Sequence, residues 1–272
     1  IGITFVEDVV SSVLEEELMG RWLAVDKLHK KYSELSPYLG IGNNPIVFVD
    51  IDGNKFVTYI KVKEKNEITG KLEKVKYKVI FDGTNTTMYE MVKGEPAETE
   101  IQYTTGKSQF VDDMITSYDY IVGAGADING AMQKMASGEE EIEVKYKKNG
   151  GEYYYGVIKI DFSAGTVVRT KDKDGKKVKS IESAALAFWS EVYHGYLDKY
   201  DLKKKAELKI DETPQLDNEE YYIHVEIENK VVDALKKNDP TNKEPKRESY
   251  YDAYKNVKTE GPTSTTKKTK SK

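Results

Sequence analysis

The stretch WSEVYHGY, residues 189–196, holds the residues best suited to chemistry. In a helical motif of the type H-E-x-x-H, two imidazoles four residues apart bind Zn²⁺, and the glutamate accepts a proton from water. Glu191 and His194 occupy the base and second-ligand positions, whereas Ser190 stands where the first histidine belongs. A hydroxyl is a poor zinc ligand. The pattern therefore predicts a catalytic Glu191 and a ligand His194 in a zinc site that Ser190, at the degenerate position, weakens.

The composition limits the sites that the chain can build. Its 272 residues include no cysteine, which excludes disulfides, thiolate zinc sites and cysteine nucleophiles. Any metal must be bound by carboxylates and by the three histidines, at positions 29, 194 and 224. The net charge of −5 gives no sign of a nucleic-acid partner. No apolar run is long enough for membrane insertion, and the first residues, IGITFVEDVV, do not form a signal peptide.

Periodicity predicts an α+β fold in which antiparallel hairpins precede a helical site region. Apolar and charged residues alternate over 55–81 and over 140–162, where the sequence KKNGG marks a turn. Residues 169–180 are expected to form a polar loop. Helical spacing predicts helices over 108–123, 127–138, 181–199 with Ser180 as N-cap, and 216–237 with Asn218 as N-cap. Residues 259–272 are basic and lack apolar side chains, so we expect a disordered tail.

Residues 20–54 carry a set of short motifs in a fixed order. These are Gly20-Arg21-Trp22, Val25-Asp26, Leu35-Ser36-Pro37-Tyr38, Asn43-Asn44-Pro45, Asp50 and Asp52-Gly53. The segment resembles the C-terminal end of the RHS-repeat-associated core of polymorphic toxins. In that family the core ends a long β-shell, and a variable toxin domain follows it. The resemblance implies an RHS core remnant over 1–54 and an effector domain over 55–258.

The predicted effector domain has a resemblance of its own. Residues 185–201, 218–231 and 246–254 are similar to the zinc metallopeptidase effectors that follow such cores. Those proteins carry H-E-x-x-H on a helix, and a downstream Glu-Glu segment supplies the third ligand. The resemblance implies a zincin-like site in which Glu219 or Glu220 joins His194. It also implies a secreted effector, delivered by a specialised secretion system, with a protein substrate in a target cell and a cognate immunity protein.

The residues leave alternatives open. His224 follows Glu220 by four positions, so on a helix the two could join His194 around a metal, or His224 could be a surface residue. The chain could also be a non-catalytic binding or structural module derived from a peptidase fold, or a toxin of another class such as a nuclease. A serine hydrolase built on Ser190 and His194 is disfavoured, because a mid-helix serine lacks oxyanion donors.

Overall fold

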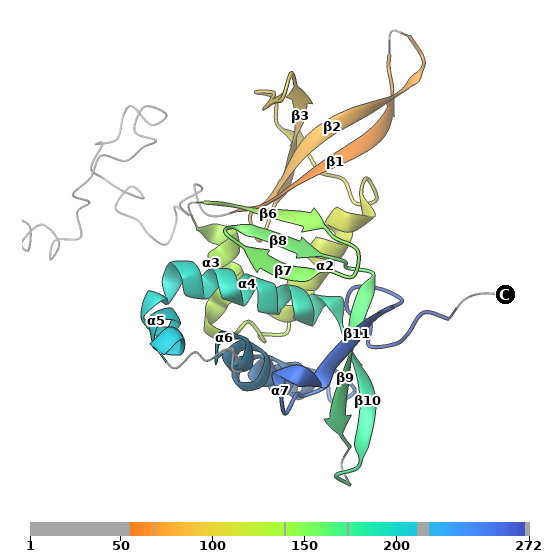
Figure 1. Cartoon of the computed structure of the whole chain (residues 1–272). Helices are drawn as coiled ribbons and strands as arrows, with labels where there is room; N and C mark the ends of the chain where they lie inside the picture. Colours follow the sequence, from red (N-terminus) through yellow and green to blue (C-terminus); the bar gives the residue numbers. More distant parts are fainter. Residues whose placement is uncertain (1–54, 68, 139, 173, 211–217, 270–272) are drawn as a thin grey trace, which may run out of the picture. The chain divides into compact units, whose positions relative to one another are not determined.

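The computed structural model describes residues 55–67, 69–138, 140–172, 174–210 and 218–269 (Figure 1). The predicted RHS-like segment and His29 lie outside the described residues. Helices and mixed sheets are both present, which confirms the α+β class.

The predicted hairpin over residues 55–81 is confirmed. Its strands pair antiparallel with Phe56 opposite Phe81, and both rings lie in the main apolar core. Gly70 has a φ of 67°, a conformation that favours glycine in the connecting turn. The strands are β1 (Lys55–Lys65) and β2 (Leu72–Phe81), and the sheet continues through β3 (Thr86–Val92), β4 (Glu95–Pro96) and β5 (Ile101–Gln102).

The prediction of a hairpin around KKNGG is wrong, because the strands on the two sides of this turn do not pair with each other. β6 (Glu141–Tyr146) runs parallel to β8 (Val157–Ile160), and β7 (Gly151–Tyr154) forms the antiparallel hairpin with β8. The reason is burial. The alternate apolar side chains of β6 and β8 are buried, so these two strands lie side by side in the core, while no residue of β7 is buried. The order β4-β3-β2-β1-β6-β8-β7 places β7 at one edge of the sheet.

Residues 169–180 were expected to be a loop, but most of them belong to a second sheet. β9 (Ala164–Lys171) pairs antiparallel with β10 (Lys177–Glu182) on one side and with β11 (Ala253–Lys258) on the other. Only the turn between β9 and β10 is polar loop, and there the carboxylate of Asp172 accepts hydrogen bonds from the amides of Asp174 and Lys176. The lysine-rich sequence hides β9 and β10, which pair with each other across this turn, and β9 also pairs with β11, which is distant in the chain.

The predicted helices form, although one begins later than expected. α2 (Gln109–Val122), η2 (Ile128–Gly130) and α3 (Ala131–Ser137) confirm the first two predictions. α4 (Ala184–Tyr200) is capped by Ser183, whose hydroxyl accepts a hydrogen bond from the Leu186 amide at 3.2 Å. The predicted cap Ser180 belongs to β10 instead, because the extended backbone of that strand continues to Glu182.

The last helical region has three parts. These parts are α6 (Asn218–Tyr221), the π-helical segment η3 (Tyr222–Ile227) and α7 (Glu228–Asn238). The helix α5 (Leu202–Ile210) precedes this region, and the short helix η4 (Tyr250–Asp252) follows it. Asn218, predicted as the N-cap, begins α6, and its side chain donates to the Leu208 carbonyl at 3.3 Å. No helix among the described residues is both long and apolar enough to cross a membrane.

The expectation of a disordered tail is wrong for residues 259–267. The Pro262 carbonyl accepts a hydrogen bond from the Ala185 amide at 2.8 Å, in the first turn of α4. Thr259 is buried, donates its amide to the Ser163 carbonyl at 3.0 Å, and forms an antiparallel bridge with Lys267. Backbone hydrogen bonds therefore hold a segment whose side chains are polar.

Candidate metal centre

α4 is the buried helix that carries three of the predicted site residues. It contacts β7 on one side and η3 on the other, and Figure 1 shows it between the sheet and the α6–α7 region. Every residue from Phe188 to Leu197 is buried. Polar groups inside a protein require partners there. Ser190, Glu191 and His194 must therefore find partners among the other groups of the fold.

The partners come from α6, η3 and α7. His224 lies four residues after Glu220 and four before Glu228, and it contacts both carboxylates. Its Nε2 is 3.2 Å from Glu220 Oε2, and its Nδ1 is 2.8 Å from Glu228 Oε2. His224 is only 8% exposed, so the alternative of a surface histidine is wrong. It belongs to a π-helical turn, a rare structure that is frequent at functional sites.

Two imidazoles and one carboxylate converge across these helices. His194 Nε2 lies 3.5 Å from Glu220 Oε1, while His224 Nε2 faces the other oxygen of the same carboxylate. One ligand atom from each of the three residues lies within 4.8 Å of the others. Ligands about 2.0–2.1 Å from a tetrahedral zinc ion lie roughly 3.3 Å apart. The donor set is one that could hold a small divalent cation, and the ligand atoms would have to move closer together around it.

Glu219 occupies a different place from the ligand position that the resemblance allows. Its Oε1 is 2.7 Å from Nδ1 of His194, the ring nitrogen that does not approach Glu220. Lys205 donates to the same carboxylate oxygen at 2.6 Å and lies 3.0 Å from Asp198 Oδ1. A carboxylate on Nδ1 fixes the orientation of an imidazole and leaves Nε2 for a metal. Of the two predicted glutamates, Glu220 is therefore the ligand candidate, and Glu219 orients the ring of His194.

The surrounding carboxylates set the charge of both imidazoles. Burial by itself lowers the pKa of His194, but the hydrogen bond with Glu219 and the charge of Glu220 outweigh it and raise that pKa. Burial also opposes protonation of His224, yet the charge of Glu228 and the hydrogen bond with Glu220 raise its pKa to about 10. A metal binds neutral imidazole. A metal held at this centre would therefore displace protons, and its binding would strengthen as the pH rises.

Glu191 faces the same cavity as the three ligand candidates. The cavity has a volume of about 670 Å³, and β7 lines it together with α4, α6 and η3. Burial raises the pKa of Glu191 to about 7, and the charges of His194 and His224 limit the rise. A carboxylate with a pKa near neutrality is suited to general-base catalysis. The predicted base thus lies in a cavity with the ligands.

Ser190 is not directed at the cluster of ligand candidates. It is fully buried, and its hydroxyl lies 2.7 Å from Glu228 Oε2 and 3.2 Å from the Leu186 carbonyl oxygen. The hydroxyl therefore has acceptors of its own, and the position does not act as a weakened ligand. Full burial also argues against Ser190 as a nucleophile, since a substrate could not reach it.

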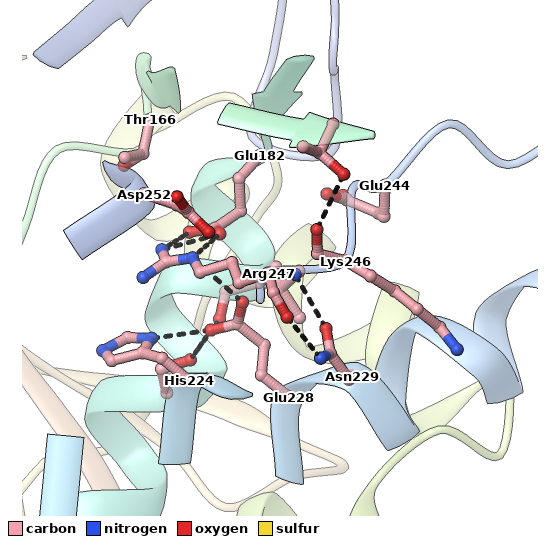
Figure 2. A network of polar contacts seen from close by, with 12 residues as sticks. Thr166, Glu182, His224, Glu228, Asn229, Glu244, Lys246, Arg247 and Asp252 are labelled. Carbon is pink, nitrogen blue, oxygen red and sulfur yellow. Dashed lines mark hydrogen bonds and ion pairs between the residues drawn. The ribbon is translucent and has the colours of Figure 1, made fainter. Parts of the chain in front are cut away.

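Sequence reasoning missed a buried ion-pair network behind His224, drawn in Figure 2. Arg247 donates from Nε and Nη2 to the two carboxylate oxygens of Glu182, at 2.8 and 2.7 Å. Its Nε also lies 3.5 Å from Glu228 Oε1. Burial disfavours a charge on Glu228, but Arg247 and then His224 outweigh burial and hold its pKa well below the usual range. The spacing Glu220, His224, Glu228, four residues apart each time, was the available signal.

The comparisons with known proteins give no relative. No family model matches the chain, and no curated protein or solved structure matches it.

Proposed function

We propose that the chain is a zinc-dependent hydrolase of peptide bonds, in which His194, Glu220 and His224 bind the ion and Glu191 is the general base. The observation that carries the proposal is the approach of both imidazole Nε2 atoms to the two oxygens of Glu220. Two histidines and one glutamate, with a position left for water or substrate, are a known ligand set of catalytic zinc. His224 supplies the second imidazole, which the sequence HExxH pattern would place at residue 190.

The residues divide the chemistry between them. Zinc bound by these three side chains would act as a Lewis acid that polarises a carbonyl group and acidifies water. Glu191 would take the proton from the attacking water, since it faces the same cavity and its pKa is raised to about 7. It could then return that proton to the leaving amine, as a general acid.

The edge strand β7 supports a peptide as the substrate. Gly150, Gly151, Glu152 and Tyr153 line the cavity, and β7 has a strand neighbour on one side, β8. An extended peptide can add to such an edge through main-chain hydrogen bonds. A Cβ atom on Gly151 would come within 3.1 Å of Glu191 Oε1, so the glycine keeps the strand close to the base.

The biological setting is proposed from the sequence alone. The motifs of residues 20–54 support a secreted polymorphic-toxin effector, delivered by a specialised secretion system as the tip of an RHS protein. The substrate would then be a protein of the target cell, and a cognate immunity protein would neutralise the effector.

A second candidate, a non-catalytic binding or structural module, has one observation in its favour. Each imidazole is already satisfied by carboxylates, His194 by Glu219 and His224 by Glu228, both within 2.8 Å. The cluster can therefore fold without an ion, as a module that kept the fold and lost the chemistry would require. The two candidates differ in whether zinc binds and whether cleavage follows.

Zinc titration and proteolysis of the full chain test the proposal. Metal-free protein is titrated with Zn²⁺ against a competing chelator, and cleavage of unfolded casein is then followed. We expect one zinc per chain. Glu191→Gln should keep the zinc and slow cleavage by about 10²- to 10⁴-fold, and His194→Ala should lose both. Glu226→Gln, at an exposed carboxylate on η3, is the matched control and should behave as the wild type.

The outcomes separate the candidates. Absence of stoichiometric zinc at micromolar metal, with a melting temperature that a chelator does not change, would establish the non-catalytic module. Zinc binding without cleavage of any protein or peptide substrate would contradict the peptidase assignment alone.

A further inference from the structure

Ser190 and His224 are joined through a single oxygen atom. Oε2 of Glu228 lies 2.8 Å from Nδ1 of His224 and 2.7 Å from the hydroxyl of Ser190. Both are donors to this oxygen when Nδ1 is protonated. The serine comes from α4 and the histidine from η3, so Glu228 connects the two helices that build the cluster.

Glu228 is in turn held from behind. It is fully buried, and Oε1 has no hydrogen-bond partner among the described groups, although Arg247 Nε lies 3.5 Å away. The bidentate pair with Glu182 fixes the guanidinium of Arg247. The backbone of Arg247 is fixed too, because its amide donates to Asn229 Oδ1 at 2.9 Å and its carbonyl accepts from Asn229 Nδ2 at 2.8 Å (Figure 2).

A buried carboxylate in this position has one effect on the imidazole. With Nδ1–H of His224 donating to Glu228, Nε2 is the nitrogen that would give up its proton to a metal, and in the structure it lies 3.2 Å from Glu220 Oε2. Partners of this kind orient metal-binding histidines, and their removal typically costs about 10- to 100-fold in metal affinity.

We propose that Ser190, Glu228 and Arg247 are positioning residues that hold Nε2 of His224 toward the metal, so that Ser190 is part of the zinc site rather than a lost ligand. This inference rests on the proposed function. The hydroxyl of Ser190 then helps to hold a histidine of another helix instead of binding the metal itself. The chain thus builds its centre from one histidine of α4 and one of η3.

The arrangement makes a distinctive prediction for residue 190. On the sequence alone, Ser190→His restores H-E-x-x-H and should improve the zinc site. In the structure the position is fully buried against Glu228, and an imidazole there would displace the carboxylate from His224. Ser190→His should therefore weaken zinc binding rather than strengthen it.

The test compares zinc affinity across variants of the full chain. We expect Glu228→Gln to lower the affinity by about 10- to 100-fold, Ser190→Ala by less, and Ser190→Thr, which keeps the hydroxyl, to stay nearest to the wild type. Asp233→Asn, an exposed carboxylate on α7 paired with Lys246, is the matched control and should change nothing. Melting temperatures of the metal-free variants show whether each one folds.

A spectroscopic readout separates positioning from general destabilisation. In the zinc-loaded wild type, ¹⁵N NMR of the imidazoles should show Nε2 of His224 bound to the ion and Nδ1 protonated, and the Nδ1 signal should move in Ser190→Ala. Wild-type affinity and unchanged imidazole signals in both Ser190→Ala and Glu228→Gln would overturn the inference. If Glu228→Gln does not fold, Ser190→Ala and Ser190→His decide. Absence of zinc from the wild type would instead overturn the proposed function.

Discussion

The two imidazoles of the cluster are supported in opposite ways. Glu219 and Lys205 on the His194 side keep 12% and 17% of their side chains exposed, and Asp198 beside them keeps 34%. On the His224 side, Glu228 and Glu182 are completely buried and Arg247 is 4% exposed. Buried charges must be fully paired, whereas exposed pairs contribute little. The difference indicates that His224 is fixed by the folded core and that His194 has a more adaptable support.

Removal of the buried charge of Arg247, on the His224 side, should have the largest effect on the free energy of unfolding. Arg247→Met leaves Glu182 without its counter-charge and Glu228 with His224 alone, and removal of one partner of a buried ion pair typically costs about 3–5 kcal/mol. Urea unfolding at neutral pH measures the loss. Lys205→Met, on the other side, is the comparison variant and should cost less, because Glu219 and Asp198 keep 12% and 34% of their side chains exposed and can be solvated. Equal losses for the two variants would contradict the contrast between the two supports.

The stability of the fold should also depend on pH, through the buried carboxyl group of Glu244. Burial raises the pKa of this carboxyl to about 7, although Ser183 donates its amide to it. The folded state therefore keeps a proton that the unfolded chain releases near pH 4.5, so stability falls as the pH rises from about 4.5 to 7. Glu244→Gln should raise the unfolding free energy at pH 8 by up to about 3 kcal/mol and have little effect at pH 4. An equal gain at both pH values would exclude the carboxyl as the cause.

The smallest effect is expected on the His194 side. In Glu219→Gln the amide oxygen can still accept the hydrogen bond from Nδ1 of His194, while the charge that pairs with Lys205 is lost. Zinc affinity should fall by no more than about 10-fold, the lower end of the range for such partners. Competition with a chelator measures this against Glu228→Gln. A larger loss for Glu219→Gln than for Glu228→Gln would reverse the comparison.

Local patterns in the sequence predicted local features of the molecule. The hairpin over 55–81 and the helices over 108–123 and 127–138 follow from periodicity and turn residues that lie within each element. The parallel pairing of β6 with β8 depends on burial, and β9 pairs not only with its neighbour β10 but also with β11, which is distant in the chain. No short window of sequence contains that information.

The site shows the same limit. Spacing within one helix brought Glu191 and His194 together on α4 and Glu220 and His224 on a second helical region. It did not reveal that Ser190 contacts Glu228, or that Arg247 and Glu182, 65 positions apart, form a pair behind them. Arg247 lies in an irregular segment between α7 and η4, and only the fold places it against Glu182 of β10.

Zinc-edge X-ray absorption of the loaded full chain tests the metal centre most directly. We expect two imidazole nitrogens and a carboxylate oxygen at about 2.0–2.1 Å from one zinc ion, and a single imidazole in His224→Ala. Zinc bound by one imidazole in the wild type, or a spectrum that His224→Ala leaves unchanged, would show that His224 is not a ligand.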